Sequence, residues 1–183
     1  MRTKQELLLG KQAVALKLIT REQLKECIKI QEQKHIPLPL IFLKQGLVKE
    51  KDLMVLLEEY FKRADESETR DKGEDLVLCR LLLRSKSILP DVLLKLVIQQ
   101  KKERESQVPL TQLILRSNLI PLVKFLEIYS NLYDETFTCS GCEKEFRLIN
   151  LWPGKKLRCK HCKSIFSIPT LEEEIAEIGR AHV

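Results

Sequence analysis

Four cysteines near the C-terminal end are the residues whose type and spacing point most directly to chemistry. They form two C-x-x-C pairs with sixteen residues between them, Cys139 with Cys142 and Cys159 with Cys162. Each pair can turn so that both thiolates face one point, and two such pairs complete the tetrahedral coordination that Zn²⁺ prefers. Four thiolates leave no open position for water or substrate. We therefore expect one structural zinc per chain and no catalytic metal.

The residues around the cysteines indicate how the metal ligands are held. Aromatic and aliphatic residues recur there as in short alternating strands that face a small core: Phe137, Phe146, Leu157, Phe166 and Ile168. So small a core does not fold unaided, whereas a structural zinc contributes about 10–16 kcal/mol. We therefore predict a β zinc ribbon over residues 134–170. An iron–sulfur centre and a redox dithiol remain alternatives for the four thiols, and His161 is expected at the surface rather than on the metal.

No other pattern in the chain predicts catalysis. A G-x-x-x-x-G-K phosphate loop and an H-E-x-x-H motif are both missing from the sequence, and Gly154-Lys155-Lys156 alone does not make a phosphate loop. The two remaining cysteines, Cys27 and Cys79, take places that hold Leu, Val or Ile elsewhere in the helical repeats described below, so we expect inert buried thiols. The chain is predicted not to be an enzyme.

The composition is that of a globular protein, with 183 residues, 44% hydrophobic and 32% charged. A formal net charge of +6 permits an anionic partner without requiring one. Charged residues interrupt every apolar run well short of the ~20 residues that cross a bilayer, and the N-terminus does not read as a signal peptide. We therefore expect a cytoplasmic protein without membrane insertion, in which cysteines are thiols or metal ligands rather than disulfides.

Residues 1–133 contain four copies of one apolar pattern. Each copy carries a pair of apolar residues: Leu18-Ile19, Leu47-Val48, Ile88-Leu89 and Leu119-Ile120. A stripe of apolar residues with i, i+3, i+4 spacing begins six residues after the first member of each pair. In the third copy this stripe consists of Leu94, Val97 and Ile98. That spacing is typical of an amphipathic helix, and a shorter apolar stretch precedes each pair. The repeat predicts a short helix, a tight turn and a longer helix, and hence a mainly α fold.

Turn and cap residues agree with this unit. Thr20 and Gln23 have the spacing of a capping box, and Pro90 and Pro121 suit the first position of a helix. Residues suited to ending the preceding helix come just before three of the pairs: Gly46, Ser87 and Asn118. Glycine and asparagine readily take the left-handed conformation that such an ending requires.

The spacing of the copies divides the chain. The second and third pairs lie 41 residues apart, against 29 and 31 for the other intervals, and the wide interval holds a charged stretch with hardly an apolar residue. We predict two tandem four-helix modules, an exposed linker between them, a zinc ribbon and a tail. Their ranges are 1–61 for the first module, 62–75 for the linker, 76–133 for the second module, 134–170 for the ribbon and 171–183 for the tail.

The helical repeat resembles the N-terminal domain of type II secretion and type IV pilus assembly ATPases. The first copy matches it best, in residues Leu9-Gly10, Ala13, Leu18-Ile19-Thr20, Gln23-Leu24 and Gln31. Some members of that family bind cyclic di-GMP through an Arg-Leu-Gly motif and a terminal Gln. Here the Arg position holds Leu8, and the later copies replace the Gln by Tyr60, Lys101 and Leu132. The guanidinium groups that would grip phosphate are missing, so we do not expect cyclic di-GMP to bind.

The cysteine-rich part resembles a bacterial zinc-ribbon family with the pattern C-x-x-C, a later Phe, G-K-K-x-R-C-x-x-C and a closing Phe. Cys142 to Phe146, Gly154 to Cys159, and Phe166 reproduce that pattern. Such ribbons usually open or punctuate larger bacterial proteins, so the resemblance implies the metal site rather than a particular role. Trp152-Pro153 departs from the small polar residues that are usual before the glycine.

The last seven residues, Glu177 to Val183, can be back-translated into a common sequencing adapter that is followed by a stop codon. We therefore expect native sequence to end near Ala176, and the chain to be a fragment of a longer protein. His182 is accordingly left out of any site.

Three functions of different classes are consistent with these observations. The preferred one is a non-catalytic adaptor that binds a protein partner, with Trp152, Lys155 and Lys156 as exposed contacts at the tip of the ribbon. The second is nucleic-acid binding by the ribbon's basic residues: Lys144, Arg147, Lys155, Lys156, Arg158, Lys160 and Lys163. No clear set of aromatic residues for base stacking accompanies these charges. The third is a regulatory, ligand-sensing domain of a truncated ATPase or kinase.

Overall fold

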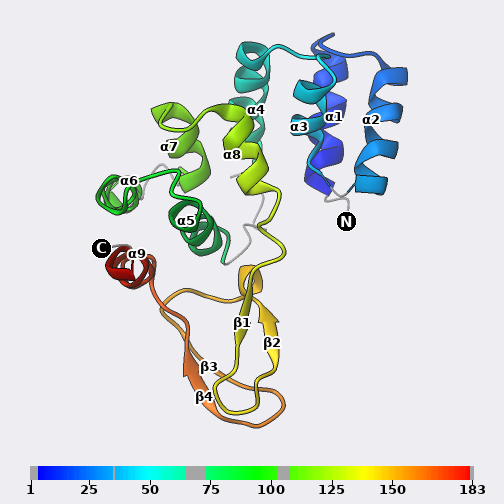
Figure 1. Ribbon diagram of the computed structural model, residues 1–183. Helices are drawn as coiled ribbons and strands as arrows, with labels where there is room; N and C mark the ends of the chain where they lie inside the picture. Colours follow the sequence, from blue (N-terminus) through cyan, green and yellow to red (C-terminus); the bar gives the residue numbers. More distant parts are fainter. Residues whose placement is uncertain (1–3, 35, 65–72, 103–107, 182–183) are drawn as a thin grey trace. The chain divides into compact units, whose positions relative to one another are not determined.

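The computed structural model describes residues 4–34, 36–64, 73–102 and 108–181 (Figure 1). The protein is mainly helical, with two small antiparallel strand pairs in its C-terminal part, which confirms the predicted fold class. Contacts between the elements define two compact units. One contains Met1–Glu68 and Pro121–Ser130, and the other contains Thr69–Ile120 and Asn131–Val183.

The first unit is built from helices alone within the described residues. They are α1 (Lys4–Ala15), α2 (Arg21–Lys34), α3 (Leu38–Lys44), α4 (Glu50–Ala64) and α8 (Leu122–Tyr129). Helix α1 packs on α4, and α2 packs on α3. Leu53, Leu56 and Leu57, the predicted stripe of the second repeat, are all buried on α4. This stripe is therefore core, as the repeat pattern predicts.

The position of α8 differs from the predicted division into modules, which placed this helix with residues 76–133. Instead, α8 packs on α3. The Lys44 ammonium lies 3.3 Å from the Glu127 carboxylate, and the backbone N–H of Leu122 donates to Glu50 Oε1 over 3.3 Å. The repeat spacing correctly predicts an amphipathic helix here, but it carries no information about which neighbours cover the apolar stripe.

Each short helix ends at a residue in the left-handed conformation, and this residue fixes the register of its repeat. These residues are Lys17, Gly46, Lys86 and Asn118. In each copy the residue two places further on is buried: Ile19, Val48, Ile88 and Ile120. In the first three copies two backbone hydrogen bonds close the turn in the manner of a Schellman motif, for example from Leu47 N to Phe42 O over 2.9 Å.

The third copy is therefore shifted by one residue from the predicted register. Lys86, rather than Ser87, takes the left-handed conformation. As a consequence Leu93 and Val97 are fully buried, whereas Leu89 and Ile98 are 71% and 42% exposed. The prediction that Ile98 belongs to the core is wrong. Ile88 and Leu89 are adjacent and both apolar, so their residue types alone do not show which of the two is buried.

Two of the predicted helix starts are confirmed and one is moved. The backbone N–H of Thr20 donates to Gln23 Oε1 over 2.8 Å, and the Gln23 N–H donates to Thr20 Oγ1 over 3.1 Å, which makes the expected capping box. Pro90 is the first residue of α6, as predicted, but Pro121 is the N-cap of α8, with an extended backbone, rather than its first helical residue.

In the second unit, several other elements pack on helix α5 (Glu74–Arg84). Helices α7 (Leu110–Ser117) and α9 (Leu171–Ala181) and the short 3-10 helix η2 (Leu148–Asn150) pack on it, while α6 (Pro90–Lys102) packs on α7 and α9. The ribbon strands belong to the same unit: β1 (Thr136–Thr138), β2 (Glu145–Arg147), β3 (Lys156–Arg158) and β4 (Ile165–Ser167).

Within the predicted tail at 171–183, residues Leu171–Ala181 form helix α9, which the sequence analysis did not predict. The helix begins with a capping box in which the N–H of Thr170 donates to Glu173 over 2.8 Å and the N–H of Glu173 donates back over 3.2 Å. Ile175 is 2% exposed. The Arg80 guanidinium donates to both carboxylate oxygens of Glu174, over 2.6 and 3.0 Å. The adapter origin of residues 177–183 stays a prediction.

Some predictions fall on residues that the structure does not describe. Most of the linker at 62–75 lies outside the described residues, although α4 extends to Ala64 and α5 starts at Glu74. His182 also lies outside them. Within the described residues, no helix combines the length and the apolar character needed to cross a membrane.

Candidate metal centre

The two C-x-x-C pairs lie in the turns of two similar hairpins. Strand β1 pairs with β2, and β3 pairs with β4, both antiparallel. In the first turn the N–H of Cys139 donates to the Lys144 carbonyl over 2.9 Å, and in the second the N–H of Cys159 donates to the Ser164 carbonyl over 2.9 Å. Glu143 and Lys163, each directly after the second cysteine, both take the left-handed conformation. The hairpins thus repeat one backbone design at an interval of twenty residues.

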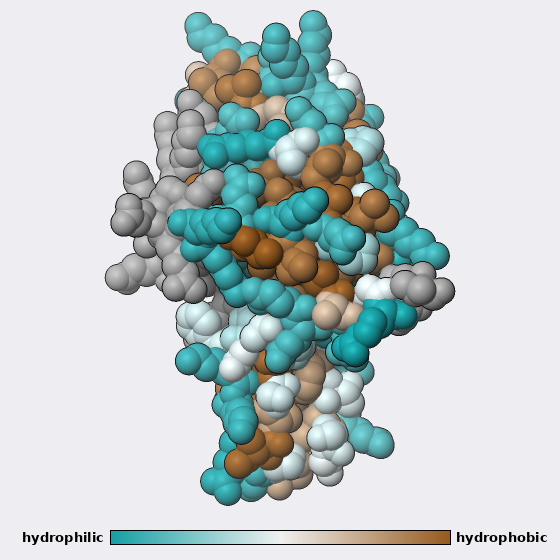
Figure 2. All heavy atoms as spheres, turned by 90° about the vertical axis from the view of Figure 1, so that its left-hand side faces the viewer, coloured by the Kyte–Doolittle hydropathy of each residue, from teal (hydrophilic) through white to brown (hydrophobic). Residues whose placement is uncertain are grey.

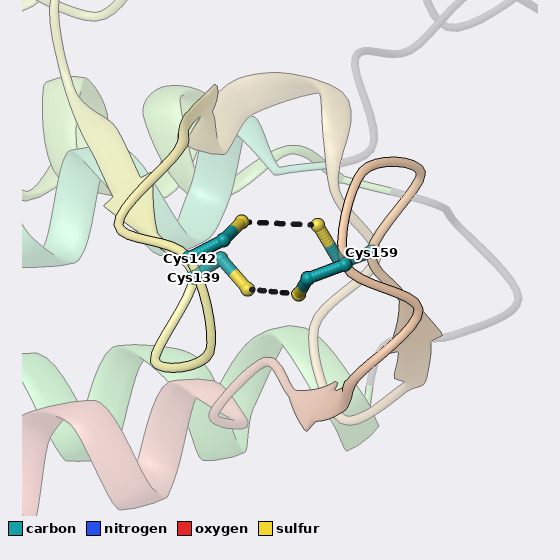
Figure 3. A group of neighbouring side chains, drawn as sticks. Cys139, Cys142 and Cys159 are labelled. Atoms are coloured by element: carbon teal, nitrogen blue, oxygen red, sulfur yellow. Dashed lines mark hydrogen bonds between the residues drawn. The ribbon is translucent and has the colours of Figure 1, made fainter.

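The two turns face each other and bring the four sulfurs together (Figure 3). The Sγ atoms of Cys139 and Cys162 are 3.7 Å apart, and those of Cys142 and Cys159 are also 3.7 Å apart. All four sulfurs lie within 4.8 Å of one another. Four sulfurs at about 2.3 Å from one zinc in a tetrahedron would be about 3.8 Å apart. The four predicted ligands therefore form one cluster at metal-binding distance.

The cysteines differ in exposure although their sulfurs converge. Cys139 and Cys159, the first member of each pair, are 0% and 1% exposed. Cys142 is half-buried and Cys162 is exposed. His161 is exposed and does not belong to this cluster, in agreement with the sequence prediction. A metal in this centre would be covered on the side of the first cysteines and accessible near Cys162.

Ser164 is a part of the centre that the sequence analysis missed. Its hydroxyl lies 2.8 Å from Cys162 Sγ and 3.3 Å from Cys139 Sγ, and a hydroxyl can donate to a thiolate. Space for this side chain is left by Gly141, because a Cβ there would lie 2.6 Å from Ser164 Oγ. The equivalent position in the first hairpin is Lys144. The sequence signal that could have indicated this contact is a serine two residues after the second C-x-x-C pair.

These contacts distribute charge unevenly over the four thiols. Hydrogen bonds from Ser164 and from the Gly141 backbone lower the pKa of Cys139 to about 6, and Ser164 also lowers the pKa of Cys162. At Cys142 the backbone N–H of Lys144 lowers the pKa, but desolvation and the neighbouring sulfurs outweigh it and raise the pKa to about 11. Without a metal, negative charge is therefore favoured on Cys139, while Cys142 keeps its proton near neutral pH.

A small apolar core lies behind the cysteines, as predicted. The rings of Phe137 and Phe166 stack with centroids 5.1 Å apart, and Phe146 lies 5.9 Å from Phe166. Leu148 and Ile168, directly after β2 and β4, are 0% and 1% exposed. The strands contribute one inward residue each, since their middle residues are half-buried and the flanking residues exposed.

The end of the ribbon away from the cysteines is joined to α5. The backbone N–H of Gly73 donates to the Ile149 carbonyl over 2.8 Å, and a Cβ at Gly73 would clash with the Leu148 carbonyl oxygen. Glu135, just before β1, accepts two hydrogen bonds from the Arg84 guanidinium over 2.9 and 3.1 Å. These contacts hold this end of the ribbon against α5 within the second unit.

Trp152, Lys155 and Lys156, the predicted partner contacts, are all exposed, and Trp152 is 50% exposed. The sequence analysis placed them at the tip of the ribbon, and the structure places them at the end away from the cysteine turns. Trp152 and Lys155 lie in the turn that follows η2, and Lys156 is the first residue of β3. Gly154 in that turn lies against Thr170, just before α9. The three residues are therefore near the helix-bearing end of the ribbon, because the strands separate them from the cysteine turns.

The other two cysteines are placed as predicted. Cys27 on α2 and Cys79 on α5 are 1% and 0% exposed, and burial raises the pKa of both thiols. A buried thiol with a raised pKa is a poor nucleophile. Neither residue contributes to the metal cluster.

Comparison of the chain with known protein families, curated proteins and solved structures found no match. The resemblances to secretion ATPases and to a bacterial zinc-ribbon family stay predictions.

Proposed function

We propose that this chain is a non-catalytic protein-interaction region of a larger bacterial protein, a cytoplasmic adaptor whose ribbon is stabilised by one structural Zn²⁺. The observation that carries the proposal is the convergence of four sulfurs, from two separate turns, onto one point. Six free thiols, without a disulfide among the described residues, fit a reducing compartment.

Zinc fits this donor set better than a cluster of several irons or a redox dithiol does. A set of four thiolates around one point suits Zn²⁺ or iron, but sulfurs within 4.8 Å of one another enclose a single ion. A cluster of several irons needs a wider cage. A redox dithiol needs only the two sulfurs of one C-x-x-C pair, whereas here contacts of 3.7 Å join sulfurs of different pairs and all four lie within 4.8 Å of one another. The zinc would act as a cross-link between the two hairpins.

The proposed adaptor role is supported by the places that the metal ligands, the apolar residues and the exposed side chains take in the structure. Four protein ligands saturate a tetrahedral ion, so the metal would activate neither water nor substrate. Many apolar residues of the repeats are buried in the core, although Leu89 and Ile98 are exposed, and Cys27 and Cys79 are buried with raised pKa values. Exposed side chains such as Trp152, Lys155 and Lys156 then remain for recognition of a partner.

Metal analysis of the purified full chain tests the central part of this proposal. We expect one zinc per chain, and its loss in a Cys139→Ser, Cys142→Ser double variant. A Cys27→Ala variant, which also removes a thiol, should keep the zinc. Iron in place of zinc, or no metal after purification in a chelator-free buffer, would contradict the proposal. Catalytic turnover by the isolated chain would contradict its non-catalytic part.

A second candidate, nucleic-acid binding by the ribbon, is favoured by the run of basic residues in the second hairpin: Lys155, Lys156, Arg158, Lys160 and Lys163. Binding to random DNA with a steep salt dependence would support it.

A further inference from the structure

The two hairpins of the ribbon share a backbone design but differ in charge. Residues 134–148, which include the first hairpin, carry four acidic and two basic side chains. The equivalent residues 154–168 carry five basic side chains and no acidic one. A zinc ion with four thiolates carries a double negative charge. If half of this charge is assigned to the second hairpin, the surface of that hairpin remains positive. The metal site does not require this difference, because both turns supply two cysteines.

Strand alternation collects part of this charge on one surface. Lys156 and Arg158 of β3, and Ile165 and Ser167 of β4, are exposed, whereas Leu157 and Phe166 point to the core. The register places Lys156 opposite Ser167 and Arg158 opposite Ile165. We call the four exposed residues the β3–β4 outer face.

Ile165 makes this face more than a basic patch. It is 69% exposed although it lies in a strand beside Arg158. In Figure 2 the ribbon, at the bottom of the view, shows a small hydrophobic patch among hydrophilic and neutral atoms. An exposed aliphatic side chain flanked by cations fits a ligand that brings both carboxylates and an apolar group.

We propose that the β3–β4 outer face binds an acidic, extended segment of a protein partner. This inference rests on the proposed adaptor function and names the chemistry of its partner. Carboxylates of the segment pair with Lys156 and Arg158, and an apolar side chain of the segment covers Ile165. Strands β3 and β4 form a two-stranded sheet among the described residues, so an extended segment can also add hydrogen bonds at a sheet edge.

The same face is less suited to nucleic acid. Single-stranded nucleic acid is usually bound by exposed aromatic rings on which bases stack. In this ribbon the rings of Phe137, Phe146 and Phe166 face one another in the core, and the exposed Trp152 is not one of the four residues of the β3–β4 outer face. The exposed side chain beside the cations is aliphatic, and an aliphatic side chain offers no stacking surface to a base. An acidic polypeptide matches the face in both charge and apolar contact.

The experiment measures binding of the zinc-loaded full chain to a short fluorescent peptide in which glutamates flank a central leucine. Single-stranded and duplex DNA of equal charge serve as competing probes. The test variants are Lys156→Glu with Arg158→Glu, and Ile165→Ser alone. The matched control is Lys144→Glu with Arg147→Glu, which makes the same charge change on the first hairpin. Zinc content is measured for every variant.

We expect the Lys156/Arg158 double variant to weaken peptide binding at least about tenfold and Ile165→Ser to weaken it about threefold. The control should change it less than about twofold. Tighter binding of DNA than of peptide, or equal losses in the test and control double variants, would overturn the inference. Absence of peptide binding by a chain that holds zinc would overturn it and leave the metal proposal intact. Absence of zinc from the wild-type chain would instead refute the metal proposal.

Discussion

Helix α5 and the ribbon strands belong to one compact unit but differ in how they are held. Along α5 six apolar side chains are 2% exposed or less: Leu76, Val77, Leu78, Cys79, Leu82 and Leu83. Each ribbon strand has only three residues, of which the middle one is half-buried. Burial of apolar surface is therefore sufficient to account for the helical part, whereas the ribbon needs another source of stability.

This difference indicates that a perturbation of the metal and a perturbation of the helical packing should have separable effects. The link between the two parts includes the packing of η2 on α5, the Gly73–Ile149 backbone hydrogen bond and the ion pairs of Glu135 with Arg80 and Arg84. The predictions below test this separation, in order of decreasing expected effect.

Replacing a buried ligand should have the largest effect. Cys159→Ser removes one of four thiolates, so we expect loss of bound zinc and unfolding of the ribbon, because binding energy is folding energy in such small metal domains. Helix content by circular dichroism should stay close to that of the wild type. Cys79→Ala, which removes a buried thiol from α5, should destabilise the helices by about 1–3 kcal/mol and keep the zinc. Zinc retention by Cys159→Ser would contradict the assignment.

Breaking the buried ion pair of α9 should affect the helical part and spare the metal. The side chains of Arg80 and Glu174 are only 12% and 5% exposed. Glu174→Gln removes the closer charged partner of the guanidinium and leaves only Glu135, 3.7 Å away, so it should lower the free energy of unfolding by about 3 kcal/mol. Glu172→Gln on the same helix removes a more exposed pair with Lys101 and should cost at most about 1 kcal/mol. Thermal and urea unfolding measure both, and equal effects would show that burial of the pair is unimportant.

Acidification should weaken metal binding with a predictable slope. Zinc binds thiolates, so protons compete with it, and Cys142, whose pKa is raised to about 11, must lose a proton to bind at neutral pH. Zinc affinity should fall at least about tenfold per pH unit between about pH 8 and pH 6. The fall should steepen below about pH 6, where Cys139 also becomes protonated. Chelator competition at several pH values measures this slope, and a flat profile would contradict the charge distribution.

Removing the Ser164 hydroxyl should have the smallest effect. Ser164→Ala deletes the donor to Cys162 and Cys139 while leaving all four ligands in place. We expect zinc affinity to fall about tenfold or less. In the metal-free chain the exposed Cys162 should be alkylated more slowly at neutral pH, because its pKa rises without the hydroxyl. Ser140→Ala, in the first turn, is the matched control and should leave both quantities unchanged. Identical behaviour of the two variants would exclude a role for the hydroxyl in the centre.

Local patterns predicted local features well. The spacing of the cysteines and the alternating apolar residues around them were sufficient to predict a ribbon with four converging thiols. The repeat pattern likewise predicted the helices and the capping box of Thr20. These features depend on residues that are near in sequence, and their geometry follows from backbone periodicity.

Features that depend on distant residues were not predictable in the same way. The sequence of α8 shows an apolar stripe, but its packing on α3 depends on which surfaces fit. In the sequence, Glu174 is one of several acidic residues in a polar segment. Its role as a buried ion-pair partner depends on its contact with Arg80, which is far away in the sequence. The capping box of Thr170 and Glu173 was a local signal for α9 that could have been used. Ser164 was missed because its role depends on Gly141 in the opposite hairpin.

The most direct test of the central claim is a titration of the zinc-free full chain with Zn²⁺ while backbone amide NMR signals are recorded. We predict that signals from residues 134–170 are poorly dispersed without metal and become dispersed and sharp at one equivalent of Zn²⁺. Signals from α5 and α6 should be dispersed throughout the titration. A ribbon whose signals are already dispersed in the metal-free chain, or that does not respond to Zn²⁺, would contradict the claim that the metal holds this part of the protein together.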